Sequence, residues 1–217
     1  MLSDELLTLF RSEMNDTTQD YLWTDADGYS YIDDAQKMFC RLTDGISDGT
    51  TGAVVDITAT AGATWLPLHA SILKIRGASR TSDGCELEIL NYEDMPARGL
   101  RFDTRTGPLQ TLIVGMEENK VRAYPIVSIT DAIKLLVFRL PLVDITTSGQ
   151  TLEVASQHLQ HLLLWAKHRA YLKQDAETFN KSKAVEFEEK FRAYCAAAKV
   201  EQGNKRHKVR KVAYGGI

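Results

Sequence analysis

The sequence predicts an α+β fold: a four-helix bundle, built from two N-terminal and two C-terminal helices, with a β-rich antiparallel sandwich or barrel inserted between them. An extended C-terminal tail follows. Apolar residues recur with helical spacing up to residue 42 and again from residue 152, and β-rich stretches fill the interval. The last nineteen residues, 199–217, carry six Lys or Arg and one Glu, a formal charge of about +5. We therefore expect a first half-bundle at 1–52, a β-rich domain at 53–147, a second half-bundle at 148–202 and a tail at 203–217.

The N-terminal helices follow from caps and apolar stripes. The first is predicted to begin at Ser3, a favourable N-cap, and its stripe consists of Leu2, Leu6, Leu9 and Phe10. After the turn-forming segment 15–20, the second begins at Thr24, which with Asp27 fits a capping box. Its predicted buried face consists of Ile32, Ala35, Met38, Phe39 and Leu42. Trp23, directly before this cap, is predicted to staple the helix start against the bundle.

The middle of the chain predicts six strands of seven to nine residues, separated by turns that contain Gly, Pro, Asp or Asn. They lie at 53–60, 71–78, 85–92, 109–116, 120–127 and 132–140. Short strands at this spacing are typical of a small antiparallel sandwich or barrel. The segment 95–106 has no clear period and contains three Arg, so we expect a long exposed loop suited to interactions.

Helical periodicity returns in the C-terminal part. The third helix is predicted from 152 to about 173, with a stripe formed by Leu152, Ala155, Leu159, Leu162, Leu163, Ala166 and Ala170. The fourth follows a break at 178–182, and its stripe consists of Ala184, Phe187, Phe191, Tyr194, Cys195 and Ala198.

Residues that could support catalysis or metal binding have simpler explanations. His158, His161 and His168 could offer imidazoles to a metal, but no metalloenzyme motif accompanies them, and we expect surface or interface histidines. Asp33 and Asp34 point about 100° apart on a helix. With Asp25 and Asp27, which suit the helix N-terminus, they predict a solvated acidic face rather than paired catalytic carboxylates. No nucleophile elbow or phosphate loop is present. We therefore expect no enzyme activity, cofactor or metal.

The spacing of the cysteines and the hydropathy pattern further restrict the class of protein to which this chain can belong. Cys40, Cys85 and Cys195 are far apart, which favours free thiols acting as small core residues over disulfides or a zinc site. The N-terminus is acidic and does not resemble a signal peptide, and no apolar run approaches bilayer-spanning length. The first sixty residues contain twelve Asp or Glu and three Lys or Arg, opposite in sign to the tail. Opposite charges at the two ends of the chain predict that it joins another molecule or another copy of itself.

The basic tail leaves two alternatives open. Its cations Lys205, Arg206, Lys208, Arg210 and Lys211 could neutralise phosphates, with Tyr214 stacking on a base, as in a nucleic-acid-binding module. The alternation of charged and apolar residues, closed by Gly215, Gly216 and Ile217, equally suits a strand or hook that docks in an acidic protein groove.

Both ends of the chain resemble the head-to-tail adaptor proteins of short-tailed phages. The N-terminal resemblance covers residues 4–48, and its most specific elements are Asp20-Tyr21-Leu22-Trp23 and Ala35-Gln36. We take Tyr21, Leu22 and Trp23 as the anchor of the subunit or bundle. The C-terminal resemblance follows the pattern of a Phe-rich helix, a basic run and a Tyr-Gly-Gly ending: Phe187, Phe191, Tyr194, Cys195, Ala198, Glu201, Lys205 to Lys211, and Tyr214 to Gly216.

The resemblance implies a non-enzymatic structural protein of the virion neck, assembled in the host cytoplasm without a membrane. It implies a dodecameric ring below the portal protein, with genomic DNA passing through the lumen without sequence-specific binding. The tail, residues 205–217, would lodge in a groove of the portal, and the β-rich domain would face the tail nozzle or tail fibres. An acidic helix face along the channel would repel phosphates and let DNA slide.

Overall fold

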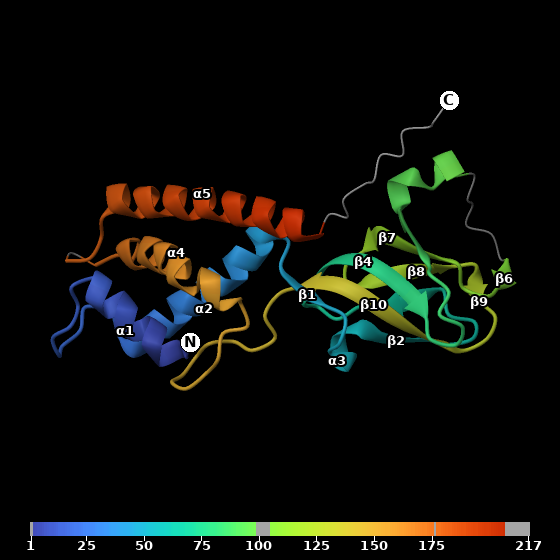
Figure 1. The fold of residues 1–217 in the computed structure, drawn as a ribbon, viewed down its shortest axis with the longest axis horizontal. Coiled ribbons are helices and arrows are strands. Elements are labelled where there is room, and N and C mark those ends of the chain that lie inside the picture. Colours follow the sequence, from blue (N-terminus) through green and yellow to red (C-terminus); the bar gives the residue numbers. More distant parts are fainter. Residues whose placement is uncertain (1, 99–104, 176, 207–217) are drawn as a thin grey trace, which may run out of the picture. The chain divides into compact units, whose positions relative to one another are not determined.

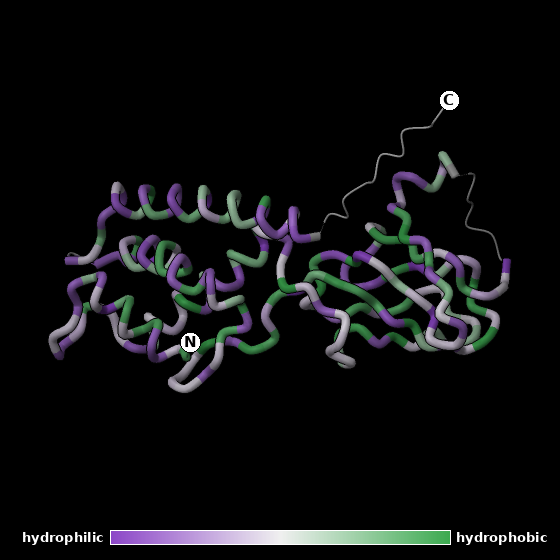
Figure 2. Tube along the Cα trace, viewed as in Figure 1, coloured by the Kyte–Doolittle hydropathy of each residue, from purple (hydrophilic) through white to green (hydrophobic). Residues whose placement is uncertain are grey.

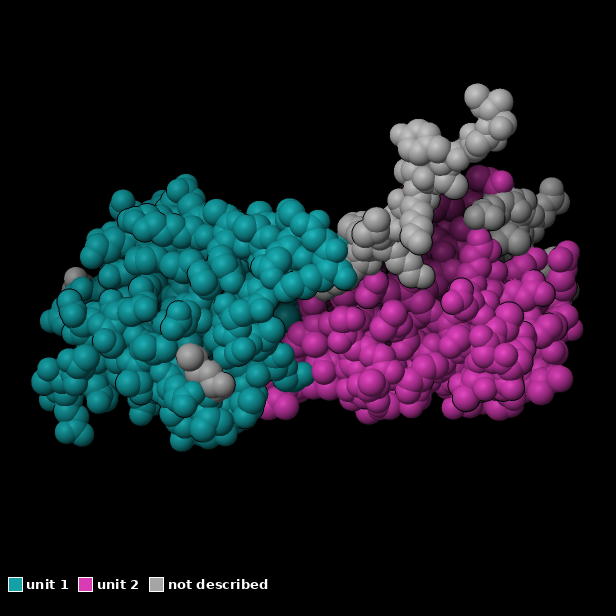
Figure 3. All heavy atoms as spheres, in the orientation of Figure 1, with its two compact units in different colours: residues 1–43, 144–217 teal, residues 44–143 magenta. Residues whose placement is uncertain are grey.

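The computed structural model describes residues 2–98, 105–175 and 177–206 and confirms the α+β class (Figure 1). The chain forms two compact units, coloured separately in Figure 3. The first contains residues 1–43 and 144–217 and holds the long helices. The second contains residues 44–143 and holds the strands.

The helical unit consists of α1 (Ser3–Glu13), α2 (Asp25–Thr43), the short 3₁₀ helix η3 (Ser156–His158), α4 (Leu159–Tyr171) and α5 (Lys181–Arg206). Helix α2 contacts α1, α4 and α5, and α4 contacts α1 and α5. Hydrophobic positions recur along α5 between hydrophilic ones (Figure 2). The most deeply buried side chains of this unit include Leu6, Phe10, Ile32, Leu159, Leu162 and Phe191.

The two N-terminal helix starts have different caps. Thr24 and Asp27 form the expected capping box: the Asp27 amide donates to Thr24 Oγ1 and the Thr24 amide donates to Asp27 Oδ2, both at 3.1 Å. At α1 the prediction is wrong, because Leu2 is the N-cap and Ser3 is already helical. The buried Ser3 hydroxyl instead donates to the Thr147 carbonyl and accepts from the Gln150 amide.

The β unit contains ten strands and three short helices among its described residues. The elements are β1 (Ile46–Asp48), α3 (Gly52–Val55), β2 (Asp56–Ala59), β3 (Trp65–Pro67), β4 (Ile72–Arg80), β5 (Glu88–Asn91), η1 (Tyr92–Asp94), η2 (Pro96–Arg98), β6 (Thr106–Gly107), β7 (Thr111–Glu117), β8 (Lys120–Tyr124), β9 (Ile126–Val127) and β10 (Asp131–Arg139). One four-stranded sheet pairs β10 with β1, β2 and β4, and the other has the order β3-β8-β7-β5. Strands β6 and β9 form a separate pair.

Residues from both four-stranded sheets share one hydrophobic core. Along β10 the inward residues Ile133, Leu135 and Val137 are at most 1% exposed, and between them Leu136 is 40% exposed, because successive side chains of a strand point to opposite faces of the sheet. The other sheet contributes Leu66, Leu112, Val121 and Ala123 to the same cluster.

Three expectations for the β unit are wrong in part. Strand β5 pairs in parallel with β7, and β6 with β9, so the pairing is not purely antiparallel. A connection of about twenty residues between β5 and β7 lets the chain re-enter in the same direction. Residues 52–55 form α3 instead of a strand start, because Asp48 Oδ1 accepts from the Thr50 and Thr51 amides and begins a turn. In the expected exposed loop 95–106, Met95 is buried and packs with a small cluster that includes Ile113.

A buried ion pair joins β1 and β10, the first and last strands of the β unit in the sequence. Arg139 Nε donates to Asp48 Oδ2 at 2.6 Å, and both side chains are less than 10% exposed. Burial opposes ionisation of Asp48, but the Thr50 amide and the Arg139 guanidinium hold the pKa of this carboxyl below its ordinary value.

We predict that Asp48→Ala lowers the free energy of unfolding by about 3–5 kcal/mol, because the buried guanidinium of Arg139 then loses the Asp48 carboxylate. Since the folded pKa of Asp48 is below the unfolded one, its contribution is present above about pH 4 and declines as the pH falls further. Urea unfolding at pH 7 and at pH 3 measures both effects.

The matched control is Asp56→Ala, which removes the exposed ion pair with Lys134 on the same strand, β10. Exposed pairs contribute about 0–1 kcal/mol, so this variant is expected to unfold close to the wild type. Equal losses for the two variants would contradict a special role of the buried pair.

Candidate docking tail and helical anchor

The predicted docking tail begins later than residue 203, because α5 continues to Arg206. Lys205 Nζ donates to Glu201 Oε1 at 2.6 Å, one helical turn earlier, and this pairing lowers the pKa of Glu201. Lys205 and Arg206 therefore lie in the last turn of α5. The other predicted docking residues lie outside the described part of the chain: Lys208, Arg210, Lys211, Tyr214, Gly215, Gly216 and Ile217.

The three predicted anchor residues divide into a buried one and an exposed pair. Trp23 is 3% exposed, and its indole N–H donates to the Ala170 carbonyl of α4 at 3.1 Å. Its ring meets Phe10 and Tyr171 edge-on, with centroids 6.1 and 6.4 Å away. Tyr21 and Leu22 are 40% and 41% exposed. Trp23 thus ties the start of α2 to α1 and α4, while its two neighbours face solvent.

A buried arginine organises the segment that carries these residues. Arg11 Nη1 donates to Asp16 Oδ2 at 3.1 Å, and Nη2 donates to the Trp23 carbonyl at 3.2 Å. Asp16 in turn accepts from the Leu22 and Trp23 amides, and the Arg11 guanidinium lies 3.5 Å from the centroid of the Tyr21 ring. The sequence prediction treated 15–20 only as a turn. The signal it missed is that Arg11 is the one cation before Lys37.

The expected solvated acidic face on α2 is wrong at Asp33 and Asp34. Asp33 Oδ1 accepts from the Ile145 amide at 2.9 Å, and Asp34 Oδ2 accepts from the Trp165 indole at 2.8 Å. Asp27 pairs with Lys173 at 3.0 Å, and although partial burial opposes it, this hydrogen bond lowers the pKa of Asp27. These carboxylates hold the helical unit together and do not form a free negative surface.

The three histidines serve packing. His158 is 3% exposed, with Nδ1 2.7 Å from the Tyr194 hydroxyl, and burial lowers its pKa. His161 stacks on the Tyr194 ring at 3.6 Å, and His168 Nδ1 donates to the Ala184 carbonyl at 2.9 Å. His158 and His168 are therefore buried, contrary to the surface expectation. Among the described residues, no group of three or more His, Cys, Asp or Glu is arranged to hold a metal ion.

None of the three cysteines forms a disulfide, and they occupy two different environments. Cys40 and Cys195 are buried, as expected for small core residues, and burial raises the pKa of Cys195 to about 12. Cys85 is exposed, which contradicts that expectation for one of the three. None of the helices in the described ranges combines the length and apolar character that a bilayer-spanning segment requires.

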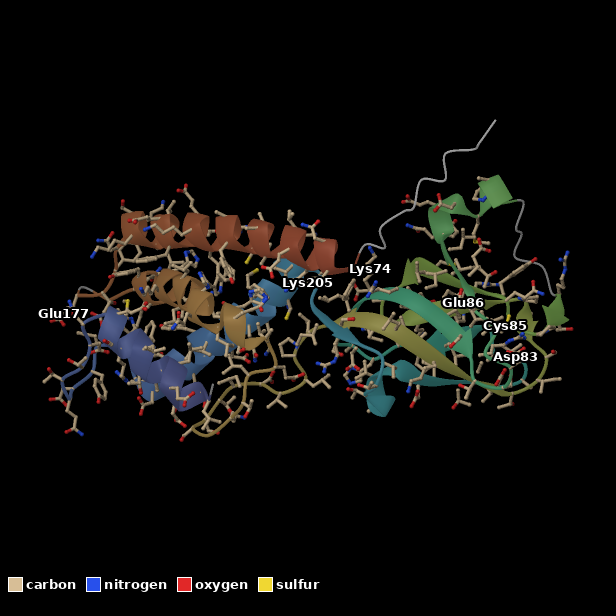
Figure 4. The ribbon with its side chains drawn as sticks, viewed as in Figure 1. Lys74, Asp83, Cys85, Glu86, Glu177 and Lys205 are labelled. Carbon is tan, nitrogen blue, oxygen red and sulfur yellow. The ribbon has the colours of Figure 1, made fainter. Side chains whose placement is uncertain are left out.

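The β unit carries a cleft of about 440 Å³ next to β4 and β5. Ile75, Ile89 and Val114 form part of its apolar lining, and Lys74, which is labelled on β4 in Figure 4, contributes a charge. Asp94, Glu117 and Lys120 add further charges to the lining, so the cleft offers both apolar and charged contacts to a partner.

Comparison with protein families identifies one match across nearly the whole chain. The model of a family described as SU10 adaptor protein matches residues 1–211. This range includes the whole β unit, all but the last six residues of the helical unit, and most of the basic segment. No curated protein matches the sequence.

We predict that Trp23→Ala lowers the free energy of unfolding by about 3–5 kcal/mol, the usual range for a buried Trp, because three packed elements lose their common contact. Leu22→Ala, at the exposed neighbouring position, is expected to stay within about 0.5 kcal/mol of the wild type. Urea unfolding followed by far-UV circular dichroism measures both. A Trp23 variant as stable as the Leu22 variant would show that the indole does not anchor α2.

Proposed function

Because this chain belongs to the SU10 adaptor protein family, a family of phage head-to-tail adaptors, we propose that it forms a dodecameric ring directly below the portal. The ring connects the portal to the tail in the virion neck and continues the channel through which DNA passes. The observation that carries this proposal is the family match over residues 1–211, which extends from α1 into the basic segment.

The C-terminal segment is the proposed hook into the portal. Helix α5 is 26 residues long, or about 39 Å, and it ends with Lys205 and Arg206. Its anchoring side is fixed, since Phe191 and Cys195 are at most 1% exposed. The cations at 208, 210 and 211 and Tyr214 follow directly in the sequence. A rigid helix therefore presents this segment to an acidic groove of the portal, where main-chain and charge-assisted hydrogen bonds can form.

The two units have separate tasks in this proposal. The helical unit forms the bundle that supports the ring and the hook. The β unit, residues 44–143, contacts the tail nozzle or tail-fibre proteins, and its cleft of about 440 Å³ is the proposed receptor for apolar side chains of these partners. DNA passes through the lumen without sequence-specific contacts, so the ring needs no base-reading residues.

We predict that deletion of residues 207–217 leaves the free energy of unfolding within about 0.5 kcal/mol of the wild type and abolishes docking onto purified portals. Replacing Lys208, Arg210 and Lys211 together by Gln is expected to weaken docking and to flatten its salt dependence, because screened attraction is removed while Tyr214 is kept. Co-sedimentation with portals over a salt series measures both variants.

The matched control is Lys190→Gln, which removes a cation in an exposed i,i+4 pair with Glu186 on α5 and should leave docking unchanged. Normal docking by the truncated chain would refute the hook. If the full chain instead bound duplex DNA with a steep salt dependence and did not bind portals, the alternative function, a nucleic-acid-binding module, would replace the adaptor proposal.

A further inference from the structure

The core of the β unit is covered unevenly. Five partly buried hydrophobic residues pack against it, and four of them line the cleft of about 440 Å³: Leu68, Ile72, Ile89 and Val114. Val121, a core residue that is 0% exposed, lines the same cleft. The lining comes from β4 of one four-stranded sheet and from β5, β7 and β8 of the other. The cleft is therefore an opening into the shared core between the two sheets.

Strand β4 is joined to the segment that leads into β5 at one end only. The Leu87 amide donates to the Ala78 carbonyl at 2.8 Å, near the end of β4. After this contact the chain leaves β4 and pairs with β7 in the other sheet. Figure 4 labels Lys74 near the start of β4 and Glu86 beyond its other end. The two sheets are thus linked beside the end of β4 and open beside its start.

Both strands that border the opening have an unpaired edge. In the described part of the chain, the main chain of residues 73–77 pairs with β10 and with no other segment. Strand β5 pairs with β7 along one edge only. The Leu87 amide points to β4, and the Glu88 amide, on the opposite edge, donates to the Gln110 carbonyl at 2.9 Å. Because successive amides alternate in direction along a strand, the Ile89 amide points to the open edge.

A second hollow shows that the gap between β4 and β5 continues along both strands. This hollow of about 650 Å³ is lined by Gly77 and Ser79 of β4 and by Glu86 and Ile89 on the returning segment. Ile89 lines the cleft as well, so the two hollows adjoin the same part of β5. Two register shifts mark bulges between β4 and β10, and bulges bend a strand. The gap is therefore long enough to follow several residues of each strand.

These features define the chemistry of an occupant. An extended polypeptide can pair its main chain with an unpaired strand edge and place alternate side chains in the neighbouring cleft. Charge selects no particular sign here, because the charged lining residues of the cleft balance: Lys74, Lys120, Asp94 and Glu117. The strongly basic C-terminal segment of another copy is therefore not favoured. Pairing between the β4 edges of two copies is not favoured either, since an isologous contact closes a pair and not a ring.

We propose that the gap between β4 and β5 binds an extended segment of a tail protein by strand addition. Apolar side chains at alternate positions of that segment enter the cleft and complete the cover of the core. Its main chain pairs with the free edge of β4 or β5. The inference rests on the proposed function in one respect, namely that the partner of the β unit is a tail protein.

The first test measures binding of the full-length chain to the purified tail nozzle and tail-fibre proteins of the same phage by biolayer interferometry. Ile89→Lys places a charge in the cleft, which is how natural sheets block pairing at an edge. It should weaken binding of the partner at least about tenfold. The matched control is Ile129→Lys, at a residue that is 77% exposed and lines neither hollow, and it should bind like the wild type. Urea unfolding verifies that both variants are folded.

The second test needs no variant and reports on the main chain. Hydrogen exchange of the wild type, followed by mass spectrometry, should slow at least about tenfold at residues 73–77, 88–91 or both when the tail protein binds. Exchange in β10 should not change, because this strand is already paired on both edges. Unchanged exchange in both bordering segments of the complex would overturn strand addition, as would normal binding by Ile89→Lys.

Further outcomes separate this inference from the proposed ring. A chain that docks onto portals but binds neither tail protein would overturn strand addition and leave the ring standing. A chain that binds a tail protein through this gap but not the portal would refute the ring alone. Slower exchange at 73–77 and 88–91 on raising the concentration of the chain by itself would identify a second copy as the occupant and overturn the proposal.

Discussion

The helical unit depends on how the chain is rejoined after the β unit. A hundred residues separate α2 from the return of the chain at residue 144, and closing so long a loop costs conformational entropy. Asp33 and Lys37, one turn apart on α2, hold the returning chain: Asp33 accepts from the Ile145 amide at 2.9 Å, and Lys37 lies 2.6 Å from the Asp144 carboxylate. Asp4 on α1 accepts from the Gly149 amide at 2.8 Å. These contacts place α4 and α5 against α1 and α2.

Each unit is therefore stabilised by contacts of its own. The β unit has its own core, shared by both four-stranded sheets, and its own buried pair, Asp48 and Arg139. Substitutions on the surface of the β unit therefore need not disturb the helical unit. In the helical unit, Tyr194 fixes α5 through contacts of its own: its hydroxyl lies 2.7 Å from His158 and its ring stacks on His161.

The sequence predicts elements with a strong period and misses those set by distant contacts. All four long helices follow from apolar stripes, although the third was predicted from residue 152 and begins only at Leu159. The Thr24 capping box follows from two residues. The parallel pairing of β5 with β7 has no local signal, because strand direction depends on the path of the connection. Strand β1 is only three residues long and is defined by its partner β10. The cap at Ser3 fails because a hydroxyl that fits an N-cap is recruited by residues 147 and 150.

The candidate site shows why charge counts from a sequence mislead. Twelve acids in the first sixty residues suggest a negative surface, yet Asp16, Asp33 and Asp34 are acceptors inside the helical unit. Only a structure distinguishes acidic side chains that accept hydrogen bonds inside the fold from those that remain available to partners at the surface. Of these twelve acids, Asp20 is exposed and forms no ion pair with another described residue, whereas Asp16 is buried beside Arg11. The net charge of a segment therefore does not measure the charge that its surface presents to a partner.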